Sequence, residues 1–201
     1  MIAIIDYDAG NIKSVLKAFE YIGENVVLTR DKNEIIKADK VVLPGVGSFG
    51  DAMEKIHNYD LYDVIKEVVS KEVPFLGICL GLQLLFENSD ETKGVNGLKL
   101  LEGNIIKIPE AEGLKIPHMG WNSIKINPSS RLFKGISDNS YVYFVHSYYL
   151  KAKSESIVAA TTEYGVNIHA AVEKGNLFAC QFHPEKSGEV GLNILKNFAK
   201  L

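Results

Sequence analysis

The stretch Pro74-Phe-Leu-Gly-Ile-Cys-Leu-Gly-Leu-Gln83 decides how the rest of the chain is interpreted. Its first part, Phe75 to Ile78, is a short apolar run bounded by a proline and by glycines, which is typical of a buried strand in a parallel sheet. Leu80 to Glu87 then has apolar residues at i, i+3 and i+4, the spacing of a helix. Cys79 therefore lies where a strand turns sharply into a helix.

The two glycines around Cys79 indicate a chemical role for its thiol. Gly77 and Gly81 give the pattern of a nucleophile elbow, with sulfur in place of the usual serine oxygen. So tight a turn leaves no room for Cβ atoms at the flanking positions, and we expect it to expose the central side chain. The N–H groups that begin the helix favour a thiolate. A lone cysteine is more often a small buried hydrophobe, but glycine on both sides favours a nucleophile.

Length and composition limit the classes of protein that the chain can belong to. The chain has 201 residues, 46% of them hydrophobic, so we expect a single domain over residues 1–201. A net charge of −3 with interspersed signs gives no basic face for nucleic acid or for a membrane surface. The most apolar stretch, residues 73–86, is too short to span a bilayer, and the first residues do not resemble a signal peptide. Two widely separated cysteines make no disulfide framework, which predicts a cytoplasmic protein.

Strand and helix patterns alternate in the first half of the chain. We expect strands over residues 1–5, 25–29 and 40–43, with helices over residues 12–22 and 32–38 between them. Asn11 is placed to cap the first helix. This β-α-β-α-β alternation predicts an α/β fold with a doubly wound, mostly parallel sheet flanked by helices, whose ligands bind at the carboxyl ends of the strands.

The pattern changes from about Asn104 onwards. Segments with strand periodicity follow one another at residues 105–108, 123–126, 141–145, 157–162, 168–173 and 177–182. We expect an additional antiparallel or mixed strand region in the C-terminal half that extends the same domain. Residues 188–199 have one apolar helical face and are predicted to form a closing helix.

The glycine-rich loop after the third strand has two interpretations. Gly45-x-Gly47-x-x-Gly50 matches the dinucleotide-binding fingerprint, but the acidic residue required about 20 positions later would fall inside helical sequence, so we reject a nucleotide cofactor. Gly45, Val46 and Gly47 suit a flexible loop beside the elbow whose backbone N–H groups face a developing oxyanion. An ordinary tight turn is the alternative.

A cysteine nucleophile needs a histidine to hold the proton and a third group to orient the ring. Of the five histidines, His183 ends an apolar strand pattern in Gln181-Phe-His183-Pro-Glu185. Pro184 favours an extended His183, so the side chains of His183 and Glu185 can project to one side. These residues predict a Cys79, His183, Glu185 triad. Cys180 is expected to be a core residue.

The elbow sequence and His183-Pro-Glu185 together resemble the class I (triad) glutamine amidotransferase family, whose members release ammonia from glutamine through a γ-glutamyl thioester. The match extends over nearly the whole chain. Further motifs narrow it to the branch that supplies ammonia to imidazole glycerol phosphate synthase in histidine biosynthesis. They are Pro44-Gly-Val-Gly47, Pro117-His-Met-Gly-Trp-Asn122, His146-Ser-Tyr148 and His183-Pro-Glu-Lys-Ser187. Other branches would share the triad without Pro-His-Met-Gly-Trp-Asn.

The resemblance implies roles for individual residues. Cys79 attacks the carboxamide, His183 transfers protons, and Glu185 orients His183. The N–H groups of Leu80 and of the Gly45-Val46-Gly47 loop hold the oxyanion. Glutamine is held by Gln83, Glu91, His146, Ser147 and Tyr148, where Ser147 replaces a threonine that is also familiar. The surface that meets the partner comprises Asn11, His118, Met119, Gly120, Trp121, Asn122 and Lys186. No metal or cofactor is implied.

The implied partner is a cyclase subunit with a (β/α)8 barrel, in a heterodimer. Ammonia in neutral water is mostly protonated and not nucleophilic, so it must reach its acceptor by a protected path. We expect weak glutaminase activity in isolation and a rise when the loaded cyclase docks. The alternatives are the glutaminase of another class I amidotransferase, a stand-alone cysteine hydrolase of similar fold, and a non-catalytic regulatory relative, which would have no need for an intact triad.

Overall fold

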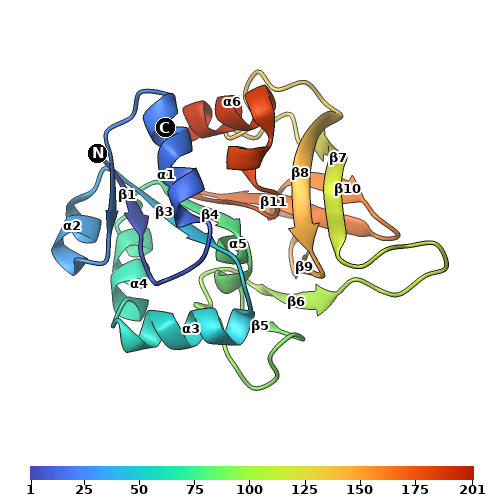
Figure 1. Ribbon diagram of the computed structural model, residues 1–201, viewed down its shortest axis with the longest axis horizontal. Helices are drawn as coiled ribbons and strands as arrows, with labels where there is room; N and C mark the ends of the chain where they lie inside the picture. Colours follow the sequence, from blue (N-terminus) through green and yellow to red (C-terminus); the bar gives the residue numbers. More distant parts are fainter.

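A nine-stranded sheet and a small three-stranded sheet organise the computed structural model, which describes residues 1–201 (Figure 1). The strands are β1 (Ile2–Ile5), β2 (Val26–Thr29), β3 (Lys40–Gly45), β4 (Phe75–Cys79), β5 (Asn88–Ser89), β6 (Gly103–Lys107), β7 (His118–Ile126), β8 (Ser140–His146), β9 (Tyr148–Ala152), β10 (Val158–Glu163), β11 (Asn167–Lys174) and β12 (Leu177–Cys180). The helices are α1 (Ile12–Tyr21), α2 (Lys32–Lys37), α3 (Phe49–Asn58), α4 (Tyr62–Ser70), α5 (Leu80–Leu84) and α6 (Gly188–Ala199), with short 3-10 turns η1 (Glu155–Ile157) and η2 (Pro184–Lys186). The large sheet has the order β2-β1-β3-β4-β12-β11-β10-β7-β8.

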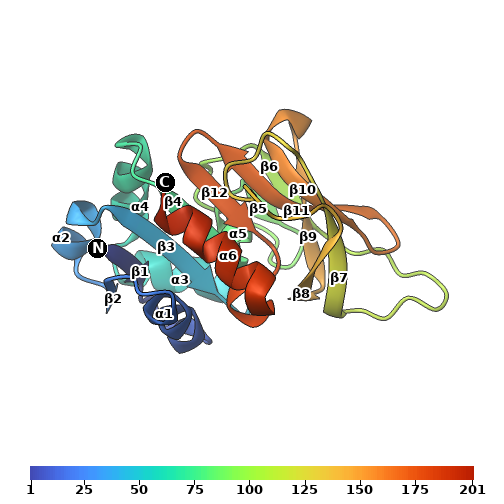
Figure 2. The same ribbon diagram turned by 90° about the horizontal axis from the view of Figure 1, so that it is seen from above.

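The first half of the large sheet is parallel and doubly wound, as the alternating pattern predicts. Strands β2, β1, β3, β4 and β12 all run in one direction. Successive residues of β1 face opposite sides, so Ile4 packs with α1 and α6 while Ile5 packs with α2, α3 and α4. Figure 2 shows α1 and α6 in front of the sheet. Burial on both faces explains why these strands are continuously apolar.

The second half of the sheet is antiparallel, which confirms the predicted change of pattern. Strand β12 pairs in parallel with β4 and antiparallel with β11, so it joins the two halves. Strands β10, β7 and β8 continue the antiparallel part, and β5, β6 and β9 form the small sheet. Strand β9 was not among the predicted strands. None of the helices combines the length and the apolar character needed to cross a membrane.

Three local predictions are corrected by the structure. Helix α5 ends at Leu84 instead of Glu87, and β12 ends at Cys180 instead of Phe182. Asn11 has a left-handed backbone, with φ 65°, and its side chain makes no capping hydrogen bond to α1. A left-handed residue does not have the extended backbone from which a side chain usually caps a helix, and a partner far along the chain takes the Asn11 amide instead.

Candidate active site

The turn between β4 and α5 is the predicted nucleophile elbow. Cys79 has φ 55° and ψ −108°, a conformation that L-residues rarely adopt. A Cβ at Gly81 would lie 1.8 Å from the Leu43 carbonyl oxygen, and one at Gly77 would lie 2.8 Å from the Gly81 oxygen. Both glycines are therefore required by close backbone packing, as the sequence predicts.

The thiol of Cys79 lies at the edge of a cavity and is not freely exposed. Only 6% of Cys79 is accessible to solvent, which corrects the expectation of an exposed thiol. The cavity has a volume of about 390 Å³ and lies at the carboxyl end of β4, where ligands bind in sheets of this kind. Its lining comprises Val46, Gly47, Cys79, Leu80, Gln83, Glu91, Pro117, Val145, His146, Ser147 and Tyr148. No cluster of three or more side chains is arranged to hold a metal ion.

His183 and Glu185 form a buried pair beside the elbow. The extended backbone of His183 and the η2 turn bring His183 Nδ1 to 2.7 Å from Glu185 Oε1, and both side chains are almost completely buried. His183 Nε2 makes no hydrogen bond within the chain. Burial lowers the pKa of His183, but the neighbouring Cys79 sulfur and the Glu185 carboxylate stabilise the imidazolium more strongly and raise the pKa to about 10. This pair can hold and transfer a proton.

Asn11 lies beside the carboxylate of this pair. Its Nδ2 donates a hydrogen bond of 2.7 Å to Glu185 Oε1, the oxygen that also bonds His183. The second oxygen, Oε2, makes no hydrogen bond within the chain. The sequence places Asn11 on the partner surface, whereas the structure engages its side chain with Glu185. No local pattern reveals this contact, because the two residues are 174 positions apart.

The loop after β3 lies beside the elbow, as predicted. Val46 and Gly47 line the cavity, and neither backbone N–H donates a hydrogen bond within the chain. Gly47 has φ 105°, which favours glycine. Gly45 differs from its neighbours because it belongs to β3, pairs with Cys79 and does not line the cavity. Its missing Cβ leaves room for the hydroxyl of Tyr7.

Polar groups line the rest of the cavity. Glu91 Oε2 accepts a hydrogen bond of 2.8 Å from the Phe49 N–H at the start of α3. Tyr148 begins β9, the strand that the sequence did not predict, and Ser147 directly precedes it. Gln83 Nε2 donates to the Tyr148 carbonyl oxygen at 3.2 Å. The residues predicted to hold the substrate thus share one cavity with Cys79.

A buried hydrogen-bonded chain connects strand β7 to the cavity. His146 Nδ1 lies 2.8 Å from the Tyr148 carbonyl oxygen, His118 Nδ1 lies 2.9 Å from His146 Nε2, and Asn122 Nδ2 lies 3.3 Å from His118 Nε2. Burial lowers the pKa of His118 to about 4 and that of His146 to about 3, so both rings are neutral at neutral pH. The carbonyl oxygen only accepts, which fixes the tautomer of each ring in turn.

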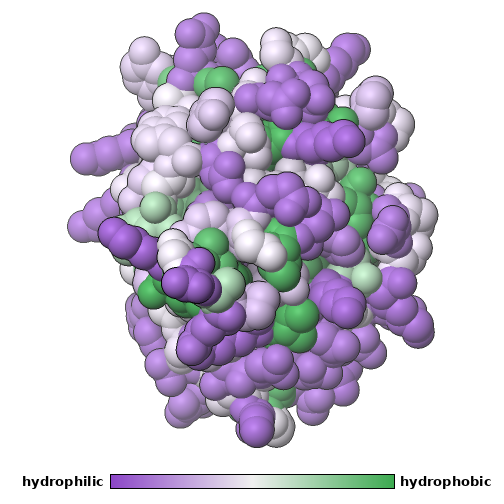
Figure 3. All heavy atoms as spheres, turned by 90° about the vertical axis from the view of Figure 1, so that its right-hand side faces the viewer, coloured by the Kyte–Doolittle hydropathy of each residue, from purple (hydrophilic) through white to green (hydrophobic).

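Side chains alternate between the two faces of β7, so the residues predicted to meet the partner do not all lie on one surface. His118 is 2% exposed and stacks on Tyr164, so it is not a surface residue, which corrects its predicted position. Met119 and Trp121 point to the opposite side of the strand and are 62% and 55% exposed. Gly120 and Asn122 are partly buried, and Lys186 is exposed. Figure 3 looks onto the right-hand side of Figure 1 and shows hydrophobic residues there in small separate groups.

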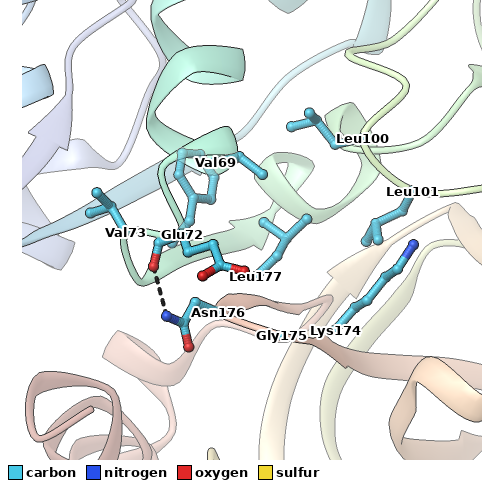
Figure 4. Close-up of a pocket in the computed structure, with 10 residues that line it drawn as sticks. Val69, Glu72, Val73, Leu100, Leu101, Lys174, Gly175, Asn176 and Leu177 are labelled. Carbon is cyan, nitrogen blue, oxygen red and sulfur yellow. Dashed lines mark hydrogen bonds between the residues drawn. The ribbon is translucent and has the colours of Figure 1, made fainter.

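A second cavity, of about 270 Å³, lies at the other end of the sheet (Figure 4). Its lining includes Phe75 and Leu177, the first residues of β4 and β12, Lys174 at the end of β11, and the loop residues Glu72 and Asn176. Asn176 Nδ2 donates to the Glu72 carbonyl oxygen. This cavity is at the amino ends of the strands and contains none of the predicted site residues.

An α/β sheet with a cysteine elbow, an oriented histidine and an adjacent glycine loop defines a class of hydrolytic enzyme. The family model described as glutamine amidotransferase class-I matches residues 3–201, so the chain belongs to this family. A solved glutamine amidotransferase structure has a similar fold, with a TM-score of 0.76 at 17% identity over 99% of this chain and 100% of that one.

Relatives with higher identity place the chain within the class. It is 50% identical over 201 residues to the imidazole glycerol phosphate synthase subunit HisH of Methanocaldococcus jannaschii, with full coverage of both chains. It is 54% identical over 200 residues to the HisH subunit of Bacillus mycoides, covering 98% of this chain and 93% of the relative. The chain is thus a member of the HisH family of imidazole glycerol phosphate synthase subunits, which confirms the predicted branch.

Proposed function

We propose that this chain is the glutaminase subunit of an imidazole glycerol phosphate synthase and hydrolyses glutamine with Cys79, His183 and Glu185. The arrangement at the cavity carries the proposal. Cys79 occupies a strained elbow at the edge of a cavity, and His183, oriented by Glu185, lies close enough for the Cys79 sulfur to raise its pKa. A nucleophile, a proton carrier and an orienting carboxylate are the parts that acyl transfer requires.

The first half of the reaction transfers the acyl group to sulfur. The Cys79 thiolate attacks the side-chain carbonyl carbon of glutamine, and the carbonyl oxygen becomes an oxyanion. The unpaired N–H groups of Val46 and Gly47, together with that of Leu80, stabilise this charge. When the C–N bond breaks, His183 Nε2 donates its proton to the leaving nitrogen. The products are ammonia and a γ-glutamyl thioester on Cys79.

The second half releases glutamate. The neutral His183 now accepts a proton from water through Nε2, and the resulting hydroxide attacks the thioester carbon. The same N–H groups stabilise the second oxyanion. The C–S bond breaks, which regenerates the thiolate and the imidazolium. Glu185 keeps Nδ1 protonated throughout, so that Nε2 is the atom that exchanges the proton.

The remaining polar groups of the cavity suit the amino-acid end of glutamine. Glu91 is held by the Phe49 N–H and supplies a carboxylate for the α-ammonium group. Ser147 and Tyr148 offer backbone and hydroxyl groups to the α-carboxylate, while Gln83 and His146 hold the Tyr148 carbonyl in place. Burial keeps His146 neutral, so in our proposal it acts by hydrogen bonding.

The ammonia is delivered to a cyclase subunit in a heterodimer. The exposed Met119 and Trp121 suit the docking surface, because methionine and aromatic side chains are enriched at interfaces. Lys186 is exposed as well and is placed at this surface by the resemblance to the family. The continuous sheet through β4, β12 and β11 supports one domain over residues 1–201. A catalytic thiol that must stay reduced supports a cytoplasmic location.

The test is glutamate release from glutamine by the purified chain, alone and with a cyclase subunit that carries its ribonucleotide ligand. We expect low activity alone, strong stimulation by the loaded cyclase, and loss of activity in Cys79→Ala without loss of cyclase binding. Cys180→Ala is the matched control, because Cys180 is also a buried free cysteine. High activity that ignores the cyclase would keep the triad and refute the histidine-pathway role. An active Cys79→Ala variant would refute the triad.

A further inference from the structure

Gln181 is a buried polar residue next to the nucleophile to which the mechanism above gives no role. It follows the end of β12 and is completely inaccessible to solvent. Its Nε2 lies 3.6 Å from Cys79 Sγ, within hydrogen-bonding distance for sulfur. Gln181 lies two positions before His183, and both side chains neighbour the sulfur of Cys79. A hydrogen bond is electrostatically stronger in a buried site than in water, so this amide can stabilise a charge on the sulfur.

The hydrogen bonds around Gln181 fix which end of its amide faces the sulfur. The Tyr148 carbonyl oxygen only accepts, so the atom of Gln83 that lies 3.2 Å from it must be the donor Nε2. The same Nε2 lies 3.0 Å from Gln181, which must therefore present Oε1. The other end of the Gln181 amide is then Nε2, directed at Cys79 Sγ. A backbone carbonyl thus determines the orientation of both glutamines.

We propose that Gln181 is a catalytic residue that donates a hydrogen bond to the sulfur of Cys79 and stabilises its thiolate. The proposal rests on the proposed function, since it concerns the same nucleophile. Cys79 is almost withdrawn from water, so its negative charge needs donors from the protein. The Gln181 amide supplies one such donor, in addition to the imidazolium of His183. Gln83 and Tyr148 are positioning residues in this arrangement, because they act on the sulfur only through Gln181.

Two substitutions separate the donor role from a structural role. Gln181→Glu keeps the size of the side chain and an acceptor for Gln83 Nε2, but it replaces the donor to sulfur by a second acceptor. Gln181→Met removes both hydrogen bonds. Both variants are made in a Cys180→Ala background, so that Cys79 is the only thiol. The Cys180 thiol bonds the Phe182 carbonyl oxygen. Because the Cys180→Ala chain is the parent of both variants, any effect of this background on Cys79 is common to all three proteins.

The assay is the rate of alkylation of Cys79 by iodoacetamide as a function of pH, which needs neither glutamine nor a partner. We expect the rate at neutral pH to fall on the order of tenfold or more in both variants, and the midpoint of the pH profile to rise by about one unit for each tenfold loss. The uncharged Gln181→Met variant decides the question, because a carboxylate at this position would repel the thiolate whatever the native role of the amide. If Gln181 only packs against its neighbours, a folded Gln181→Met protein is alkylated with the rate and the pH midpoint of its parent, and that result would overturn the proposal.

A measurement on the unsubstituted protein covers the case in which both variants fail to fold. The side-chain amide ¹⁵N–¹H resonances of Gln181 are followed through the pH titration of Cys79. We expect them to shift with the midpoint found by alkylation, and resonances that ignore that titration would overturn the proposal. Glutamate release by the parent chain together with the loaded cyclase is measured separately. A parent chain that releases no glutamate even with the loaded cyclase, but has the expected alkylation profile, would refute the proposed function and leave the hydrogen bond from Gln181 to the sulfur standing.

Discussion

The contact between Asn11 and Glu185 yields the sharpest test of how the triad is built. We replace Asn11 by glycine, because Asn11 has φ 65° and glycine adopts this backbone without strain. The substitution therefore removes the side-chain amide and leaves the loop between β1 and α1 undisturbed. Alanine would add backbone strain and confuse the result.

The expected magnitude follows from the donors to Glu185. Its buried carboxylate receives two hydrogen bonds, from His183 Nδ1 and from Asn11 Nδ2, both 2.7 Å long and both on Oε1. A hydrogen bond to a charged group is worth on the order of 1.5 to 3 kcal/mol. If the whole loss appears in the transition state, the glutaminase rate falls roughly 10- to 150-fold. KM is expected to change little, because Asn11 does not line the cavity.

The assay is the steady-state rate of glutamate release by the assembled enzyme, with cyclase binding measured in parallel. Asn139→Gly is the matched control, since Asn139 also has a left-handed backbone and its side chain bonds only an exposed neighbour. We expect the control to keep the original kcat. An Asn11→Gly enzyme with an unchanged kcat and weakened cyclase binding would refute our reasoning, and would show that Asn11 acts at the partner surface.

Two further predictions concern the buried histidines His118 and His146 and the elbow at Cys79. Burial lowers the pKa of His118 to about 4 and that of His146 to about 3, so between those values and about 6.5 the unfolded chain binds more protons than the folded one. The stability that the two neutral rings contribute is therefore complete above a pH of about 6.5 and is lost as the pH falls. The urea midpoint should drop less on acidification in His146→Gln than in the original protein. An equal drop in both proteins would contradict burial of the neutral rings as the cause. Gly81→Ala should lower the free energy of unfolding by on the order of 1 to 3 kcal/mol or more and abolish glutaminase activity, because its Cβ would meet the Leu43 carbonyl oxygen at 1.8 Å. Gly94→Ala meets no atom within 4 Å but strains a backbone with φ 83°, so it should lower the free energy of unfolding and still remain active.

Local sequence patterns determined the architecture and the centre of the site. Continuous apolar runs separated by amphipathic helices predict a doubly wound sheet, because strands buried on both faces have no polar side. The glycines around Cys79 predict the elbow from their spacing; the Cβ that Gly77 lacks would meet Gly81, four residues away, whereas the one that Gly81 lacks would meet Leu43 on the neighbouring strand. His183 and Glu185 are two positions apart, so their pairing also follows from local geometry.

Only the tertiary structure decided the contacts that join distant segments. Asn11 reaches Glu185 across 174 positions, and Gln181 reaches Cys79 across 102, distances over which no local periodicity carries information. The burial of His118 beside the exposed Met119 depends on which face of β7 is covered, and β9 pairs with β6, a strand that lies much earlier in the chain. Hydrogen bonds inside the site depend on how separate elements pack, and packing is a property of the whole chain.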